Sequence, residues 1–198
     1  PEGLVHRDVS DADTTSDATV KVLDAEIRSL VELRGQLTKM PFDPVVRQMV
    51  HARQYVFAGL GASGHVAADA CHKFFRLGVP ASAITESPSS LQFAAIAGSG
   101  DVLFLISKTG HTDVICDAAR VARENSAVVV AITDPESRLA SEAAYTFACD
   151  PEEDTNIYTP RSSRLVHLAL IDALHVSTAL ALGDVAAENL RRSKDALL

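Results

Sequence analysis

Two short stretches of this chain combine glycines with hydroxyl side chains: residues 59–64 (GLGASG) and residues 107–112 (SKTGHT). Each stretch follows a run of apolar residues and precedes a helical pattern. A strand that turns through glycine into the N-terminus of a helix presents backbone N–H groups to an anion. Two such turns in one chain predict a binding site for a phosphorylated ligand.

The second stretch carries three hydroxyl side chains, Ser107, Thr109 and Thr112, around Gly110. A phosphate dianion needs several hydrogen-bond donors without a bulky side chain in its way, and hydroxyls at a helix N-terminus supply them. Each hydrogen bond to a charged group contributes about 1.5–3 kcal/mol. The alternative is that Thr112 only caps the helix that follows it, but that role needs one hydroxyl rather than three.

The first stretch also matches the pattern G-x-G-x-x-G, and Glu86 lies at the end of the next predicted strand. A dinucleotide-binding loop has this arrangement, so a nicotinamide cofactor is an alternative ligand. Ser63 inside the turn and the hydroxyl-rich residues 85–90 favour a compact polyhydroxy ligand instead. For Gly64, a purely structural role in tight turning and close packing is the simpler explanation.

A long polar segment, residues 150–160, precedes the last helical pattern and is suited to close over a site at a sheet edge. Ser162 and Ser163 follow it and would offer further donors. Arg161 or Arg164 would form a bidentate pair with the carboxylate of a sugar acid. Helix capping by the serines and solvation of the arginines are equally good explanations.

We therefore expect the ligand to contact both turns, with secondary contacts from the last polar segment and the helix after it. The expected primary contacts are Ser63, Ser107, Thr109, Gly110, Thr112, Gly61, Ala62 and Lys108. The expected secondary contacts are Glu153, Ser162, Ser163 and Arg164. Lys108 either pairs with the charge of the ligand or points to solvent.

A phosphosugar isomerase is the alternative function. Aldose–ketose isomerisation needs a base near the reacting carbons and an acid. Glu152 or Glu153 would be the base, and His65, His111 or His167 would be the acid. Nothing in the spacing pairs these residues, and a run of acidic residues is more often a solvated turn. The sequence therefore favours binding without catalysis.

The histidines and cysteines of the chain show no pattern that indicates a metal. Its 7 histidines form no H-x-H or H-E-x-x-H arrangement, and its 3 cysteines form no C-x-x-C pair. We expect neither a metal nor a cofactor, and reduced thiols in a cytoplasmic protein.

The length of 198 residues suits one sizeable α/β domain with extra helices, and 47% of the residues are hydrophobic. The formal net charge of −8 argues against this chain binding a nucleic-acid backbone by itself.

Residues 165–182 approach the length of a membrane span, but polar residues recur along one side of that helix: Arg164, His167, Asp172 and His175. This stripe predicts a buried core helix and no membrane partner.

Apolar runs and helical patterns alternate along residues 54–182. We expect strands at residues 54–60, 82–85, 101–106, 127–132 and 144–149, with helices at 63–77, 88–97, 112–124, shortly after 135, and 161–182. Continuous apolar strands between helices predict a parallel sheet covered on both faces. The fold class is a doubly wound, five-stranded α/β sandwich with flavodoxin- or Rossmann-like layers, which binds ligands at the C-terminal ends of its strands.

The remaining segments flank this domain. Residues 1–16 are expected to be a linker, residues 17–53 to form N-terminal helices, residues 54–182 to form the binding domain, and residues 183–198 to form a C-terminal helix or tail. Since the chain opens with proline and has its first methionine at position 40, we expect it to be part of a longer protein.

Within residues 17–53, Asp17 is expected to cap a helix that runs to about Leu37, and Asp43 with Pro44 to open a second one. The first helix has apolar residues at a 3-4 spacing: Val20, Leu23, Ile27, Leu30 and Leu37. Such a stripe would cover the domain or pair with a second subunit.

The two turns resemble the signature of the sugar isomerase (SIS) domain family, G-x-G-x-S after the first strand and S-x-S-G-x-T after a later one. Residues 59–63 and 107–112 match it, with Thr109 in place of the usual serine. The resemblance covers about residues 50–182. It implies an SIS-type fold that binds a phosphosugar, with the effector contacting Ser63 and Ser107.

Residues 73–76 (KFFR), 151–158 (PEEDTNIY) and 163–165 (SRL) extend this resemblance to the RpiR-type bacterial transcriptional regulators, and most of all to their HexR branch. That resemblance implies a non-catalytic effector sensor, attached to an N-terminal helix-turn-helix domain that lies outside this chain and makes the contacts with DNA. It also implies a homodimer or tetramer. The implied effector is 2-keto-3-deoxy-6-phosphogluconate (KDPG) or a similar sugar-acid phosphate, and the first helix would transmit its binding.

Overall fold

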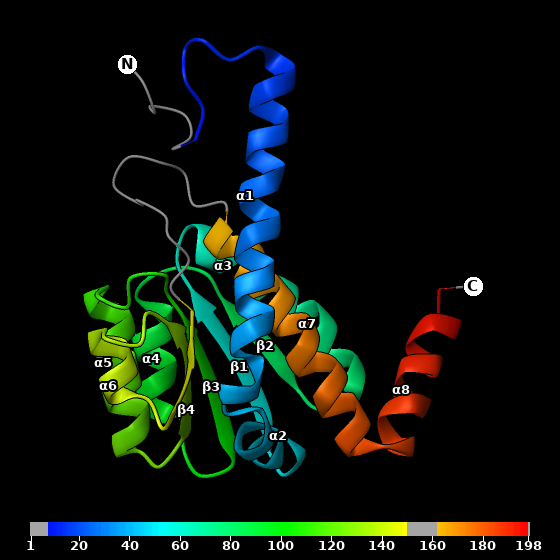
Figure 1. The fold of residues 1–198 in the computed structure, drawn as a ribbon. Coiled ribbons are helices and arrows are strands. Elements are labelled where there is room, and N and C mark those ends of the chain that lie inside the picture. Colours follow the sequence, from blue (N-terminus) through cyan, green and yellow to red (C-terminus); the bar gives the residue numbers. More distant parts are fainter. Residues whose placement is uncertain (1–7, 150–161, 198) are drawn as a thin grey trace.

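Five parallel strands form one sheet with helices on both faces (Figure 1). The strands are β1 (Gln54–Gly59), β2 (Ala81–Ile84), β3 (Asp101–Ile106), β4 (Val128–Thr133) and β5 (Tyr145–Ala148). The computed structural model describes residues 8–149 and 162–197. This architecture confirms the doubly wound α/β class predicted from the sequence.

The strand order β2-β1-β3-β4-β5 determines where a ligand can bind. Within the sheet, the chain forms β1 first, then β2 at one edge, and then crosses to the other side of β1 to form β3. The register pairs Gly59 of β1 with Ile106 of β3, so the loops that follow these strands leave the sheet side by side. This is the switch point of an open α/β sheet, where the loops diverge and leave a crevice.

One face of the sheet carries an aromatic core. It is covered by α1 (Thr15–Gln36), α2 (Phe42–Val50), α3 (Ala62–Phe74) and α7 (Ser162–Leu182). Phe57 of β1 stacks on Phe104 of β3 with 4.9 Å between ring centroids, and Phe74 of α3 packs on Phe57 at 5.1 Å. This packing fixes α3, whose first turn begins directly after β1.

The opposite face is packed with smaller side chains. It is covered by α4 (Ser89–Ile96), α5 (Asp113–Glu124) and α6 (Arg138–Glu142). Four alanines of this face, at positions 94, 118, 119 and 122, are fully buried, so the helices lie close to the strands. The remaining elements are η1 (Leu37–Lys39), η2 (Phe75–Leu77) and α8 (Asp184–Asp195), and α8 lies against η2.

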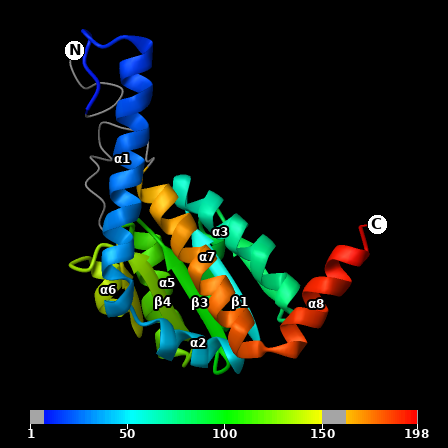
Figure 2. The same ribbon diagram turned by 45° about the vertical axis from the view of Figure 1, so that its right-hand side comes forward.

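Helix α1 has its N-cap three residues before the predicted one, Asp17. Thr14 is the N-cap residue, and its side chain accepts a hydrogen bond from the backbone N–H of Asp17 at 3.2 Å. The Asp17 carboxylate in turn accepts from the backbone N–H of Thr14 at 3.1 Å, which completes a capping box. The first part of α1 extends beyond the sheet and its covering helices (Figure 2).

Helix α2 also begins earlier than expected. Pro41 rather than Asp43 is its N-cap residue, and the helix ends at Val50. Pro44 is compatible with this register because it lies in the first turn, where its missing N–H has no partner within the helix.

Helix α7 is long and apolar enough to cross a membrane by length and composition. However, 8 of its residues are buried, and it packs against α1, α2 and α3. It is therefore the core helix that its polar stripe predicted.

At the N-terminal edge of the sheet, a buried carboxylate joins β3 to the segment before β1. Asp101 is 1% exposed and accepts hydrogen bonds from Arg53 at 2.7 and 3.0 Å and from Gln54 at 3.0 Å. Burial alone would raise the pKa of Asp101. These bonds, the backbone N–H of Gly98 and the charge of Arg53 outweigh it, and the pKa lies below its usual value.

Candidate functional site

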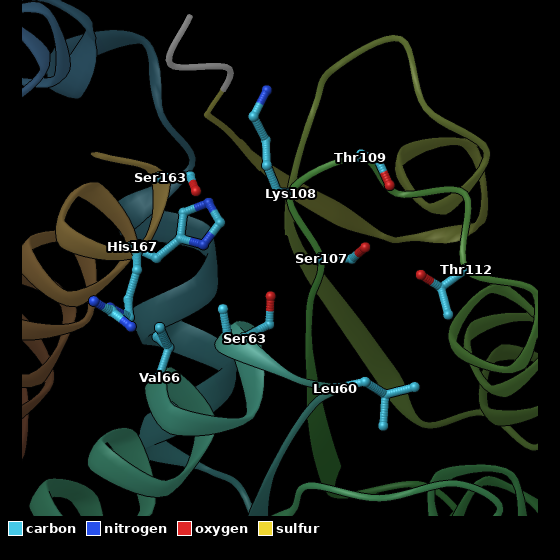
Figure 3. A pocket seen from close by; sticks show the side chains of 11 residues that line it. Leu60, Ser63, Val66, Ser107, Lys108, Thr109, Thr112, Ser163 and His167 are labelled. Atoms are coloured by element: carbon cyan, nitrogen blue, oxygen red, sulfur yellow. The ribbon is translucent and has the colours of Figure 1, made fainter. Parts of the chain in front are cut away.

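A cleft of about 170 Å³ opens at the C-terminal edge of the sheet, between the loops that follow β1 and β3 (Figure 3). It lies at the switch point described above. The residues that line it are Leu60, Ala62, Ser63, Val66, Ser107, Lys108, Thr109, Thr112, Ser163, Arg164 and His167. The two hydroxyl-bearing turns therefore meet in one cleft.

The loop after β1 forms one wall. Ser63 lies in the first turn of α3 and its side chain faces the cleft (Figure 3). A Cβ atom on Gly59 would lie 2.6 Å from the carbonyl oxygen of Ser63, so glycine lets this helical turn approach the strand. Gly61 has a φ of +55°, which suits glycine at a sharp turn into a helix.

The loop after β3 forms the facing wall and is braced by its neighbours. The backbone N–H of Ser107 donates to the carbonyl of Ile132 in β4 at 3.1 Å. The carbonyl of Gly110 accepts from the backbone N–H of Leu139 in α6 at 3.0 Å. These bonds hold Ser107, Thr109 and Thr112 in a fixed arrangement around the cleft.

Gly110 itself does not line the cleft. It has a φ of +63°, and a Cβ atom at this position would overlap the hydroxyls of Ser137 and Thr133. The role that the structure supports is therefore to let the loop pack closely against these residues.

Thr112 is the N-cap residue of α5, yet its side chain makes no capping hydrogen bond. Capping therefore does not explain the hydroxyl at this position, although it was the alternative raised by the sequence. The Thr112 side chain lines the cleft instead.

The N-terminus of α7 completes the site. Ser163 and Arg164 in its first turn line the cleft, and His167 lies one turn further on, 1% exposed (Figure 3). Helices α3, α5 and α7 thus all start at this cleft, where the partial positive charge of each helix N-terminus favours an anion.

The charged side chains that line the cleft also favour an anion. Lys108 and Arg164 carry positive charge, and none of the described residues that line the cleft is a carboxylate. In a chain with a net charge of −8, this local excess of cations and hydroxyls favours a phosphorylated ligand.

The structure places most of the predicted contact residues around one cleft. Those that line it are Ser63, Ser107, Thr109, Thr112, Ala62, Lys108, Ser163 and Arg164. Gly61, Gly110 and Ser162 lie next to lining residues without lining the cleft themselves. Glu153, together with Glu152 and Arg161, lies outside the described residues.

Three lining residues were not among the expected contacts: Leu60, Val66 and His167. His167 is one of the three histidines that could serve as the acid of an isomerase. The other two, His65 and His111, are exposed and do not line the cleft. The spacing could have identified two of the three lining residues. Val66 follows Ser63 by three residues, and His167 follows Arg164 by three residues, so each lies on the same face of its helix as a predicted contact.

Comparison with protein families and with other proteins agrees with this geometry. A family model for the SIS domain matches residues 48–177. The HTH-type transcriptional regulator HexR of Escherichia coli K12 is 37% identical over 193 residues, which cover 98% of this chain and 67% of that protein. HexR of Pseudomonas aeruginosa is 36% identical over 195 residues, which cover 98% of this chain and 68% of that protein.

Among solved structures, the Vibrio vulnificus NanR protein complexed with ManNAc-6P superposes with a TM-score of 0.79. It is 20% identical in sequence, and the match covers 89% of this chain and 68% of NanR. At this identity the likeness shows that the fold is shared.

Proposed function

The chain belongs to the SIS domain family and, within it, to the RpiR-type regulators most similar to HexR. We propose that it is the part of a bacterial transcriptional regulator of sugar metabolism that binds a phosphosugar effector. One observation carries the proposal. The hydroxyl-bearing turns after β1 and β3 converge on a single cleft that is rich in donors and contains cations.

The phosphate of the effector lies against the loop after β3. Ser107, Thr109 and Thr112 supply hydroxyl donors there, and the N-terminus of α5 adds backbone polarity. Hydrogen bonds to β4 and α6 already hold this loop in place, so binding of the ligand costs little conformational entropy. The Vibrio vulnificus NanR structure, which shares the fold, contains ManNAc-6P.

The other end of the effector lies near Ser63, Ser163 and Arg164. Arg164 is the group suited to a carboxylate, because its guanidinium can donate two parallel hydrogen bonds. A ligand with phosphate at one end and carboxylate at the other matches both walls. KDPG, or a similar sugar-acid phosphate, has this chemistry.

The regulator acts on DNA through a helix-turn-helix domain outside this chain. The chain spans about two thirds of the length of the HexR relatives that it matches, and those relatives are named as HTH-type regulators. The protein is cytoplasmic and forms a homodimer or tetramer. The effector changes DNA binding by stabilising one arrangement of the subunits over another.

A phosphosugar isomerase is the competing function. It requires a base that reaches the reacting carbons. The described lining of the cleft contains no carboxylate, and its histidine, His167, is 1% exposed. Conversion of glucose-6-phosphate to fructose-6-phosphate by the chain, abolished in Glu152→Gln or Glu153→Gln, would support the isomerase over the sensor.

Isothermal titration calorimetry with KDPG, glucose-6-phosphate and fructose-6-phosphate tests the proposal. We expect the tightest binding with KDPG and a loss of about 10- to 100-fold in Ser107→Ala, since a hydrogen bond to a charged group is removed. Ser141→Ala is the matched control, because its hydroxyl is exposed on α6 and donates to the carbonyl of Arg138. Equal affinity of wild type and Ser107→Ala would reject the site, and no heat with any of the three ligands would reject the function.

A further inference from the structure

Helix α6 packs against α5 and against the loop that follows β3 (Figures 1 and 2). The backbone N–H of Leu139 donates to the carbonyl of Gly110 at 3.0 Å, and Ser137, the N-cap residue of α6, packs against Gly110. Arg138 lies between these two residues in the chain. Its backbone is therefore fixed relative to the wall of the cleft that receives the phosphate in the proposed function.

The side chain of Arg138 reaches the start of α5 and binds two carboxylates there. One guanidinium nitrogen donates to Asp113 at 2.9 Å, and the other terminal nitrogen donates to Asp117 at 2.8 Å. Asp113 is the first residue of α5 and Asp117 follows four residues later, so the two lie on one side of the helix, about one turn apart. One arginine thus holds both carboxylates on the side of α5 that faces α6.

The position of Asp113 is unfavourable for binding of an anion. Asp113 directly follows Thr112, whose side chain lines the cleft, but Asp113 does not line the cleft itself. A carboxylate at the first position of a helix interacts with the partial positive charge of the helix N-terminus, which is also the charge that attracts a phosphate. At short range the carboxylate also repels the phosphate directly. The ion pair with Arg138 offsets this negative charge.

We propose that Arg138 is a positioning residue for the phosphosugar cleft. It holds the Asp113 carboxylate toward α6 and offsets its charge, so that the N-terminus of α5 stays available to the phosphate. Arg138 does not line the cleft, so it acts through Asp113 rather than by contact with the ligand. This inference rests on the proposed function, because it takes the phosphate to lie against the loop after β3.

A second ion pair between the same two helices separates this role from a purely structural one. Arg123, in the last turn of α5, lies 2.9 Å from Glu142 of α6. Arg123 and Arg138 are both exposed, and surface ion pairs contribute little to stability. Arg123 lies ten residues after Asp113, about 15 Å further along α5. Its loss should therefore affect the packing of α6 on α5 to a similar degree, but not the charge beside the cleft.

Calorimetric titration of the 198-residue chain with KDPG and with glucose-6-phosphate tests this role. Arg138→Gln should weaken binding of both ligands by about 3- to 10-fold at about 0.05 M NaCl, because both carry a phosphate. At about 0.5 M NaCl the loss should shrink to less than about twofold, since salt screens the exposed Asp113 charge. Arg138→Lys keeps the positive charge, and Arg123→Gln leaves the start of α5 unchanged, so both should bind within about twofold of wild type.

Restoring the charge provides a second test. The double variant R138Q/D113N has the net charge of wild type and no carboxylate next to Thr112, so it should bind both ligands within about twofold of wild type. The double variant R138Q/D195N has the same net charge, but Asp195 lies at the end of α8, which does not contribute to the described lining of the cleft. It should bind as weakly as Arg138→Gln.

The outcomes distinguish this inference from the proposed function. Unchanged affinity in Arg138→Gln, equal losses in Arg138→Gln and Arg123→Gln, or equal recovery in the two double variants would overturn the inference and leave the proposed function intact. If wild type bound neither ligand, the proposed function and the inference would both be rejected. Urea unfolding of every variant verifies that the titrated protein is folded.

Discussion

The side-chain oxygen of Ser107 accepts a hydrogen bond from the backbone N–H of Gly110, with 3.1 Å between the two atoms. This bond folds the loop after β3 back on itself, and it occupies the hydroxyl as an acceptor, so that its proton can be donated into the cleft. The same loop is tied to β4 and α6. The donors that face the cleft are thus held in position by the fold rather than ordered by the ligand.

Substitution of Gly110 should cost more stability than substitution of a helical glycine. Gly110→Ala combines a left-handed φ with a clash against Ser137 and Thr133, so we expect a loss of at least about 2 kcal/mol in urea unfolding. Gly35→Ala, in α1 with open space around it, should instead raise stability by up to about 1 kcal/mol. Similar effects of the two variants would show that the loop does not need glycine here.

Thr112→Val separates ligand binding from helix capping. Because the Thr112 hydroxyl makes no capping hydrogen bond, its removal should change the free energy of unfolding by less than about 0.5 kcal/mol. The affinity for KDPG should fall by about tenfold, while Thr112→Ser keeps it. Calorimetry and urea unfolding of the same samples measure the two effects. A large loss of stability without a loss of affinity would assign Thr112 to the helix alone.

Arg164→Gln should discriminate between sugar acids and neutral sugar phosphates. We expect KDPG affinity to fall by about tenfold or more, and fructose-6-phosphate affinity by less than about threefold, since only the former has a carboxylate. Arg120→Gln on α5, where Arg120 pairs with Glu124, is the matched control. Equal losses for both ligands would mean that Arg164 does not recognise the carboxylate.

Asp101 should make stability depend on acid pH. Its pKa in the folded state lies below the ordinary value of 3.8. The stability that it contributes is therefore present at neutral pH and is lost as the pH falls through the folded-state pKa. Asp101→Asn should be less stable than wild type by about 1–3 kcal/mol at pH 7, and this difference should shrink below pH 4.

Urea unfolding of wild type and Asp101→Asn between pH 7 and pH 2.5 measures this dependence. Glu136→Gln, at an exposed turn, should give a curve parallel to that of wild type. A constant difference between Asp101→Asn and wild type at every pH would contradict the role of the ionised Asp101 carboxylate.

The order of elements and the place of the turns were readable in the sequence, because they depend on local periodicity. Strand β3 has the predicted bounds, residues 101–106. Helix starts were less predictable. Thr14 and Asp17 both take part in one capping box, so Asp17 can be mistaken for the N-cap residue, which is Thr14. The close packing of Gly110 against Ser137 could not be predicted from the sequence, because it depends on a residue 27 positions later.

Residue types and their spacing were enough to predict which side chains can donate to a phosphate, and that these side chains follow strands. Which of them share a cleft depends on how distant segments pack. Sheet order brings the turn at Ser63 next to the turn at Ser107, and the packing of α7 adds His167 from about 60 residues further on. Hydroxyl-bearing turns form through interactions between near neighbours in the chain, whereas a cleft forms where distant segments pack, and that depends on burial of the whole core.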